Sequence, residues 1–405
     1  MRLRNLRGDE SMCVKTQLGK TYGVAPPVLS RPSQKKRGGL GTLLVLFFAL
    51  FSAAAAAQTS STSFADLVTQ ATTAREQPDV TRAIELYGQA VQLNPKWPEG
   101  WWYLGSLQYG AGSYSDARDA LSRYIELTPS AGAAMAVRGL CEFETGEYSR
   151  SLKDIQSGLS LGAANQPRNE RILRYHEAQL LTRDGRFEEA LRGYAYFAHA
   201  ELVEPELPLA VGLAGLRNPL LPKEVHEQRD LYQATGDAAL QWMAGDEKAS
   251  SAFQGLFRRF PAVANLHYLL GYLMFAADPD ESLAEFRREL EIAPSNSAAQ
   301  VMLAWGLLMR NHPVEALPYA KKAAETEPSL PAAQLVFGRA LLETGDTGGG
   351  TEHLEKALQL EPQNLETHLA LAKAYSKSGR EEDARRERLL CLQITRNEAV
   401  SGAHP

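Results

Sequence analysis

The sequence predicts an all-α protein in which pairs of helices stack as a solenoid, and three observations support this prediction. Prolines that follow helical stretches recur every 33 or 34 residues in two sections of the chain, at Pro95 and Pro129 and at Pro261, Pro294, Pro328 and Pro362. Similar text precedes them, as in AIELYGQAVQLNP and GTEHLEKALQLEP. Small residues such as Gly105 and Ala117 stand where two helices of a pair must approach closely. A fixed period of this length is typical of repeat proteins.

Residues 98–131 show how one repeat is built. The text WPEGWWYLGSLQYGAG predicts a first helix, Gly112 and Ser113 break it, and YSDARDALSRYIEL predicts a second helix. Pro129 ends the second helix, because proline lacks an amide hydrogen and clashes with the preceding turn. Each repeat is therefore predicted to be two antiparallel helices.

These spacings resemble the tetratricopeptide repeat family, in which Trp/Leu-Gly on the first helix and Ala, an aromatic residue, Ala and Pro on the second mark a 34-residue unit. The matching residues in one repeat are Trp101, Leu104, Gly105, Ala117, Leu121, Tyr124 and Pro129. The resemblance implies a right-handed superhelical solenoid of about nine repeats. The predicted repeats are 64–97, 98–131, 132–165, 171–204, 230–263, 264–296, 297–330, 331–364 and 365–398. The third, fourth and fifth lack several of the family's marks at once.

The repeats divide the chain into two predicted sub-arrays, residues 58–204 and 230–398, followed by a tail at 399–405. Between the sub-arrays lies the segment 205–229, PELPLAVGLAGLRNPLLPKEVHEQR, which contains four prolines. This composition favours an ordered loop or a short broken helix over a repeat. We expect the segment to pack over the ends of the two sub-arrays, or else to fold into the groove or against a partner.

The first 57 residues predict a signal peptide. They carry nine Lys/Arg and two acidic residues, and they end in the apolar run LGTLLVLFFALFSAAAAA from Leu40 to Ala57. A basic segment, a short apolar stretch and an A-x-A ending indicate export, with cleavage near Ala57. The alternative is an uncleaved membrane anchor formed by residues 40–57, although 18 helical residues span only about 27 Å of a ~30 Å bilayer core. Translation could begin at Met1 or at Met12.

Charge and cysteine content restrict the function. Residues 58–405 hold 34 basic and 46 acidic residues, a net charge of −12. Such an acidic chain is a poor ligand for nucleic acid or anionic lipid, both of which require a basic face. Only Cys141 and Cys391 follow the predicted cleavage site, so no disulfide framework is predicted.

The resemblance implies that places 2, 5, 9 and 12 of each repeat line a concave groove, where place 1 is the first residue of the repeat. Rigid aromatic rings there supply contact area at low entropic cost, which favours protein or peptide binding. The alternative is that these rings pack on one another or on the neighbouring helix, with no ligand. The predicted partner-binding residues are Trp102, Tyr109, Phe143, Tyr175, Tyr268, Tyr272, Phe275, Trp305 and Arg339.

The adjacent Trp101 and Trp102 are predicted to have different roles, because neighbouring side chains on a helix point about 100° apart. Trp101, at place 4, is expected to face the core, and Trp102, at place 5, is expected to face the groove. The residues predicted to pack the repeats are Trp101, Leu104, Gly105, Ala117, Gly271, Ala316, Gly338 and Ala357.

One known binding mode of the family is not predicted. Repeats that clamp a C-terminal carboxylate use lysine at place 5. That place here holds Val68, Trp102, Ala136, Tyr175, Tyr268, Val301, Leu335 and Leu369.

No motif predicts an enzyme, a cofactor or a metal site. In YHEAQL, Leu180 stands where a zinc peptidase needs its second histidine, so His176 alone cannot hold the metal. The glycine-rich text GDTGGGTEH lacks the lysine of a phosphate loop and a preceding strand. The repeats also leave no room for a catalytic domain. The sequence therefore predicts an exported, non-catalytic scaffold, periplasmic or secreted, that binds proteins or peptides in bacterial envelope assembly or secretion. The alternatives are a membrane-tethered scaffold and an accessory subunit of an envelope enzyme; the oligomeric state stays open.

Overall fold

The computed structural model describes residues 63–401 except 78, 201, 203 and 205. These residues form nineteen α-helices and one short 3₁₀ helix, and they contain no strand. The all-α prediction is therefore confirmed. None of the described helices combines the length and apolarity needed to span a bilayer. The predicted signal peptide at 1–57 lies outside the described residues.

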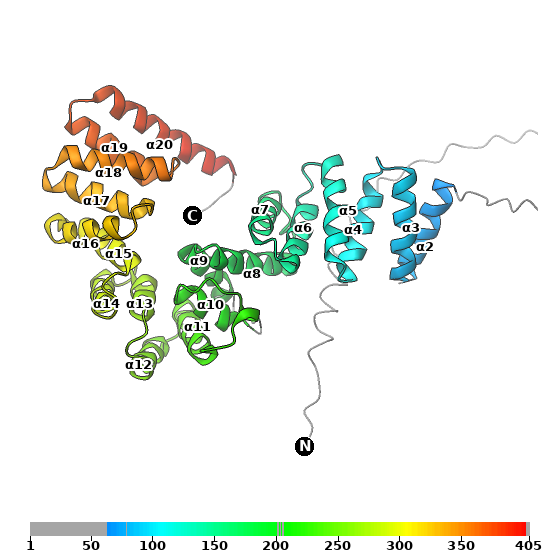
Figure 1. Ribbon diagram of the computed structural model, residues 1–405, viewed down its shortest axis with the longest axis horizontal. Helices are drawn as coiled ribbons and strands as arrows, with labels where there is room; N and C mark the ends of the chain where they lie inside the picture. Colours follow the sequence, from blue (N-terminus) through cyan, green and yellow to red (C-terminus); the bar gives the residue numbers. More distant parts are fainter. Residues whose placement is uncertain (1–62, 78, 201, 203, 205, 402–405) are drawn as a thin grey trace, which may run out of the picture. The chain divides into compact units, whose positions relative to one another are not determined.

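The chain divides into two compact units, Met1–Glu147 and Tyr148–Pro405. The division falls inside the predicted repeat 132–165, between its two helices, and not at the predicted segment 205–229. The helices of the first unit are α2 (Phe64–Glu76), α3 (Val80–Leu93), α4 (Pro98–Gly110), α5 (Tyr114–Leu127) and α6 (Gly132–Thr145). Figure 1 shows α2 to α5 side by side in chain order, as expected for consecutive helices joined by short turns.

Helix ends in the first unit follow from local chemistry. The side chains of Ser63 and Asp79 accept hydrogen bonds from backbone amides in the first turns of α2 and α3, which satisfies donors that a helix start leaves free. Helix α6 ends at Gly146, whose φ of 82° is the left-handed conformation that glycine adopts readily. The core of the first three helices includes Leu86 and Tyr87, which are almost fully buried.

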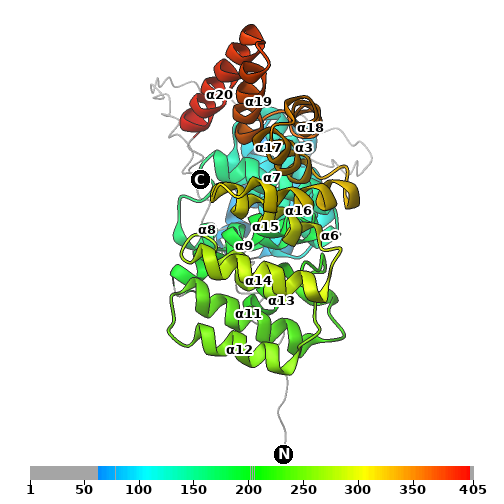
Figure 2. The same ribbon diagram turned by 90° about the vertical axis from the view of Figure 1, so that its left-hand side faces the viewer.

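The second unit continues the pattern of helix pairs. It contains α7 (Tyr148–Ser160), α8 (Pro167–Arg183), α9 (Phe187–His199), α10 (Leu207–Gly215), η1 (Pro222–Glu224), α11 (Arg229–Met243), α12 (Ala249–Arg259), α13 (Leu266–Met274), α14 (Pro279–Ile292), α15 (Ser297–Met309), α16 (Pro313–Thr326), α17 (Pro331–Thr344), α18 (Thr347–Leu360), α19 (Leu365–Lys377) and α20 (Glu381–Ser401). Figure 2 shows the pairs from α13–α14 to α19–α20 following one another within this unit.

Three glycines that recur at place 8 of their repeats lie where the two helices of a repeat cross. A Cβ atom added to Gly105 would lie 2.8 Å from Leu121, one added to Gly271 would lie 2.8 Å from Phe286, and one added to Gly338 would lie 2.7 Å from Leu354. The second helices contribute small buried residues to the same packing: Ala117, Ala316 and Ala357 are each 0% exposed. Glycine and alanine therefore set how closely the helices approach.

The segment 205–229, which interrupts the predicted repeats, contains helix α10. This helix packs very closely on α11. A Cβ atom added to Gly212 would lie 1.8 Å from the carbonyl oxygen of Tyr232, and one added to Gly236 would lie 1.6 Å from that of Pro208. All but one residue of α10 are buried. The contact is thus backbone against backbone, which only glycine permits.

A polar contact recurs at the junction between successive repeats. At place 4 of four repeats, a side-chain nitrogen bonds the carbonyl oxygen of the proline six residues earlier. The pairs are Trp101–Pro95 at 2.9 Å, Gln300–Pro294 at 2.7 Å, Gln334–Pro328 at 2.9 Å and His368–Pro362 at 3.0 Å. Each proline lies two residues beyond the end of the preceding helix, so its carbonyl has no partner in that helix and the side-chain donor satisfies it.

We expect replacement of Gln334 by leucine to lower the free energy of unfolding by about 1–3 kcal/mol, because the part-buried carbonyl of Pro328 would lose its donor and His353 Nδ1 would lose its bond to the Gln334 side-chain oxygen. Gln334→His should cost less, because an imidazole occupies the same place at His368 and reaches Pro362. Urea unfolding of both variants, followed by circular dichroism, measures the difference. Equal stability of Gln334→Leu and the wild type would contradict a stabilising role for this contact.

Candidate partner-binding surface

Three of the residues predicted to bind a partner are buried, which corrects the prediction for them. Tyr109 and Phe143 are each 7% exposed, and Tyr268 is 2% exposed. Tyr109 packs against the ring of Tyr114, with 5.8 Å between ring centroids. Tyr268 belongs to the core formed by α13–α17. None of these rings can offer a partner the contact area that the groove prediction assumed.

The two adjacent tryptophans are both half-buried, so the expected division between core and groove is not sharp. Trp101 packs against the core of α2–α4, and its indole nitrogen bonds Pro95. Trp102 packs against Tyr124 on α5, with ring centroids 5.6 Å apart. Each indole therefore has an intramolecular contact that accounts for part of its surface.

Tyr268 and Tyr272 join α13 to α9 inside the second unit. The Tyr268 hydroxyl donates to the Glu188 carboxylate, and the Tyr272 hydroxyl donates to the Glu188 carbonyl at 3.3 Å. Arg217 forms an ion pair with the same carboxylate. Burial raises the pKa of Tyr268 well above its usual range, and burial also raises the pKa of Tyr272. Both hydroxyl groups thus stay protonated as donors. The two tyrosines therefore stabilise the contact between α13 and α9.

Tyr175 has a similar structural environment on α8. Its ring lies 5.8 Å from that of Phe197 on α9 in an edge-to-face arrangement. Burial raises the pKa of its hydroxyl. Such aromatic pairs stabilise packing between helices. Phe197 belongs to the same predicted repeat as Tyr175, whereas Glu188 lies 80 residues before Tyr268, and no period of 34 residues could reveal that contact.

Phe275, Trp305 and Arg339 are half-buried; Phe275 directly follows α13, and the other two lie on α15 and α17. Phe275 lies at the end of α13, where its ring is 6.3 Å from that of Phe286. The guanidinium of Arg339 lies over the Trp305 ring, 4.6 Å from its centroid. This places a cation and an indole from two successive repeats on one surface.

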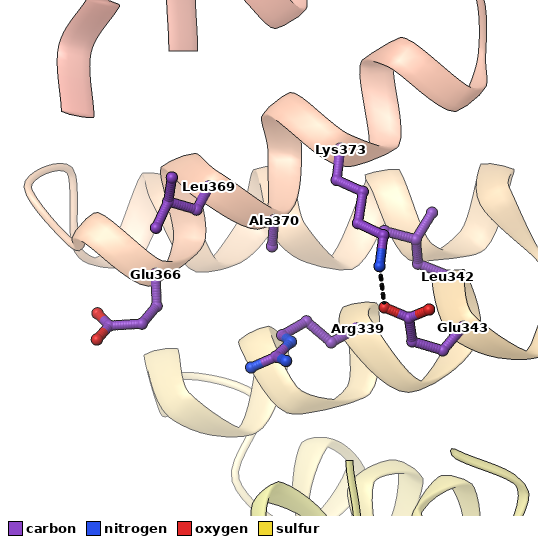
Figure 3. Close-up of a pocket in the computed structure, with 7 residues that line it drawn as sticks. All are labelled: Arg339, Leu342, Glu343, Glu366, Leu369, Ala370 and Lys373. Carbon is purple, nitrogen blue, oxygen red and sulfur yellow. Dashed lines mark hydrogen bonds and ion pairs between the residues drawn. The ribbon is translucent and has the colours of Figure 1, made fainter. Parts of the chain in front are cut away.

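A hollow of about 230 Å³ opens beside Arg339, between α17 and α19. Its lining consists of Arg339, Leu342, Glu343, Glu366, Leu369, Ala370 and Lys373. Figure 3 shows Lys373 reaching Glu343 across the hollow, with 2.5 Å between Nζ and Oε1. The hydrogen bond from Lys373 lowers the pKa of Glu343, so this pair is ionised and internally neutralised. Leu369 is 52% exposed at the edge of the hollow.

Arg339 has a different environment in the same hollow. Burial lowers the pKa of its guanidinium. The groove places 2, 5, 9 and 12 include Arg339. They leave out Glu343, which is at place 13 of the same repeat. The sequence does contain a sign of this contact. Lys373 lies four residues after Leu369 on the same helix face, and its charge favours an acidic side chain opposite it.

Metal-ligating side chains and cysteines were also located in the described residues. Within residues 63–401, apart from the four positions left out, no three His, Cys, Asp or Glu side chains come together so as to hold a metal ion. Cys141 and Cys391 are both buried. Burial raises the pKa of the Cys141 thiol, which opposes formation of the nucleophilic thiolate.

Family models and solved structures were compared with this chain. Tetratricopeptide repeat models match residues 68–131, 105–166 and 345–387. The chain matches none of the curated proteins. Among solved structures, MamA 41-end from Desulfovibrio magneticus RS-1 is 18% identical, with a TM-score of 0.37, over 41% of this chain and 94% of that one. YrrB, described as a TPR protein with an unusual peptide-binding site, is 18% identical, with a TM-score of 0.36, over 42% of this chain and 88% of that one.

Proposed function

Because the chain is a tetratricopeptide repeat protein, we propose that it is a non-catalytic scaffold that binds a protein or peptide segment on the surface of α15, α17 and α19. The observation that supports this proposal is the hollow between α17 and α19. It combines an exposed leucine, Leu369, with a half-buried arginine that lies on Trp305. A mixture of aromatic, aliphatic and arginine contacts is typical of the energetically important centre of a protein interface.

A photo-crosslinking phenylalanine analogue tests this surface in cells that naturally make the protein. Placed at Leu369, the analogue is expected to give adducts with a small number of partner proteins. The matched control is position 360, where another leucine is 43% exposed on α18 and does not line the hollow. Equal adduct patterns at both positions, or no adduct at 369, would count against the proposed surface.

We propose further that the scaffold acts outside the cytoplasm, in envelope assembly or secretion. The support is the basic, then apolar, N-terminal segment that ends at Ala57, together with the resemblance to the tetratricopeptide repeat family. A membrane-tethered scaffold and an accessory subunit of an envelope enzyme remain the alternatives.

Export predicts that the mature protein begins at or near Gln58. Sequencing its N-terminus after purification from the natural host measures this directly. A mature chain that retains residues 40–57 would instead support the tethered scaffold, because those residues are the only part of the predicted leader apolar enough to hold a membrane.

A further inference from the structure

The Arg339 side chain has donors that the protein does not use. In the part of the chain that the structure describes, no carboxylate or carbonyl group accepts a hydrogen bond from its guanidinium, whose contact is the Trp305 ring. Glu343, on the same helix, is bonded to Lys373 instead. In Figure 3 the guanidinium extends away from that ion pair, towards the side of the hollow where Glu366 lies.

An arginine in this state is poised to bind an anion. The Glu343 and Glu366 carboxylates favour the charged form of Arg339 without accepting its hydrogen bonds. Partial burial removes water from the guanidinium, and donors without acceptors cost free energy until a partner restores their hydrogen bonds. The planar guanidinium matches a carboxylate in a two-point hydrogen-bonded pair. The Trp305 ring holds the guanidinium from one face, which reduces the conformational freedom that binding would otherwise remove.

The surroundings decide what kind of carboxylate fits. Apolar contact surface lies on both sides of Arg339: Trp305 on α15 is on one side, and Leu369 on α19 is on the other. A bound segment that uses both must continue past the arginine in both directions, so the carboxylate belongs to a side chain and not to a chain end. Glu366 is exposed, and solvent screens its repulsion of the incoming charge.

We propose that Arg339 binds the side-chain carboxylate of an aspartate or glutamate in the partner segment, with apolar partner residues against Trp305 and Leu369. This inference rests on the proposed function and adds the chemistry of the partner. It differs from the carboxylate clamp of the family, because it uses one arginine at place 9 and no lysine at place 5.

Selection from two peptide libraries tests the inference on the purified full chain. Both libraries are nine residues long and capped at each end, with random flanking positions; the central residue is glutamate in one and glutamine in the other. The wild type is expected to enrich the glutamate library. For a selected peptide, changing the central glutamate to glutamine should weaken binding about tenfold or more, the effect of losing a charge-assisted pair. If the selected peptides show no preference for the central glutamate, or if a selected peptide binds only after its C-terminal cap is removed, the side-chain assignment is wrong.

Variants distinguish this inference from the proposed surface. Arg339→Gln should bind the glutamate and glutamine peptides equally, whereas Arg258→Gln, which removes the same charge from an exposed position on α12, should keep the preference. Leu369→Asp should lose both peptides. If Leu369→Asp abolishes binding but Arg339→Gln keeps the preference for glutamate, the surface stands and the role of Arg339 is wrong. If no peptide binds the wild type above a bead control, the proposed surface and the inference both fail.

The stability of an Arg339 variant gives an independent readout. A binding residue held partly desolvated without a partner should not stabilise the free protein, so Arg339→Met is expected to unfold at the same temperature as the wild type or higher. A clear decrease in the melting temperature would instead assign Arg339 a structural role in packing on Trp305.

Discussion

Replacing Gly236 by alanine is expected to lower the free energy of unfolding by about 3 kcal/mol or more. The added methyl group would lie 1.6 Å from the carbonyl oxygen of Pro208 and 2.9 Å from the amide nitrogen of Gly212. Both atoms belong to the backbone of α10, so no side chain can rotate away, and α10 would have to move as a whole. Overpacking a buried contact costs about 1–3 kcal/mol even where side chains can adjust. Urea unfolding followed by circular dichroism measures the loss.

Gly255 provides the matched control for this prediction. It lies in the middle of α12 in the same unit, and nothing comes within 4 Å of a Cβ atom added there. Gly255→Ala should stabilise the protein by up to about 1 kcal/mol, because alanine loses less entropy than glycine in a helix. If Gly236→Ala is as stable as Gly255→Ala, then α10 does not pack on α11 as closely as the structure indicates.

The sequence predicted helices well where local chemistry sets their ends, and it predicted the close crossings inside repeats from glycine at place 8. Gly271 and Gly338 do contact the second helix of their own repeats. It could not predict the crossing of α10 and α11. Gly212 and Gly236 stand outside the family's pattern, and their importance appears only when two backbones meet in three dimensions. Four prolines in the segment 205–229 favoured a loop or a broken helix, although nine residues that include Pro208 form a buried helix.

The candidate site was predicted less well than the fold, and the reason is long-range packing. The position of a residue in its repeat predicts whether its side chain points away from the second helix of that repeat. It does not predict which residues from other helices pack on that side chain. Glu188 reaches Tyr268 from 80 residues away. Arg339 is also at a predicted groove place. Among the aromatic rings of the described residues, only that of Trp305 contacts its guanidinium, and a hollow lies beside it. The same rule therefore selected a core residue and an accessible one.

Replacing Tyr268 by alanine should lower the free energy of unfolding by about 3–5 kcal/mol, as for other large buried rings. The substitution leaves a cavity beside Phe286, whose ring centroid is 5.8 Å from that of Tyr268. It also removes a donor to the Glu188 carboxylate, although Arg217 would still pair with that group. Tyr268→Phe keeps the ring and loses only the hydroxyl, so it should cost about 1 kcal/mol. Urea unfolding of the two variants separates the packing of the ring from its hydrogen bond.

Tyr319→Phe is the matched control, because it measures the effect on stability of removing a tyrosine hydroxyl that makes no hydrogen bond in the part of the chain that the structure describes. Tyr319 is half-buried on α16, and its hydroxyl has no hydrogen-bond partner among the described residues, so the substitution should be nearly neutral. If Tyr268→Phe is equally neutral, the bond to Glu188 contributes nothing to stability. If Tyr268→Ala keeps full stability and loses peptide binding, the contact between α9 and α13 must open in solution. Tyr268 would then return to the partner-binding residues, and the groove would extend from α19 along the first helices of the repeats to α13.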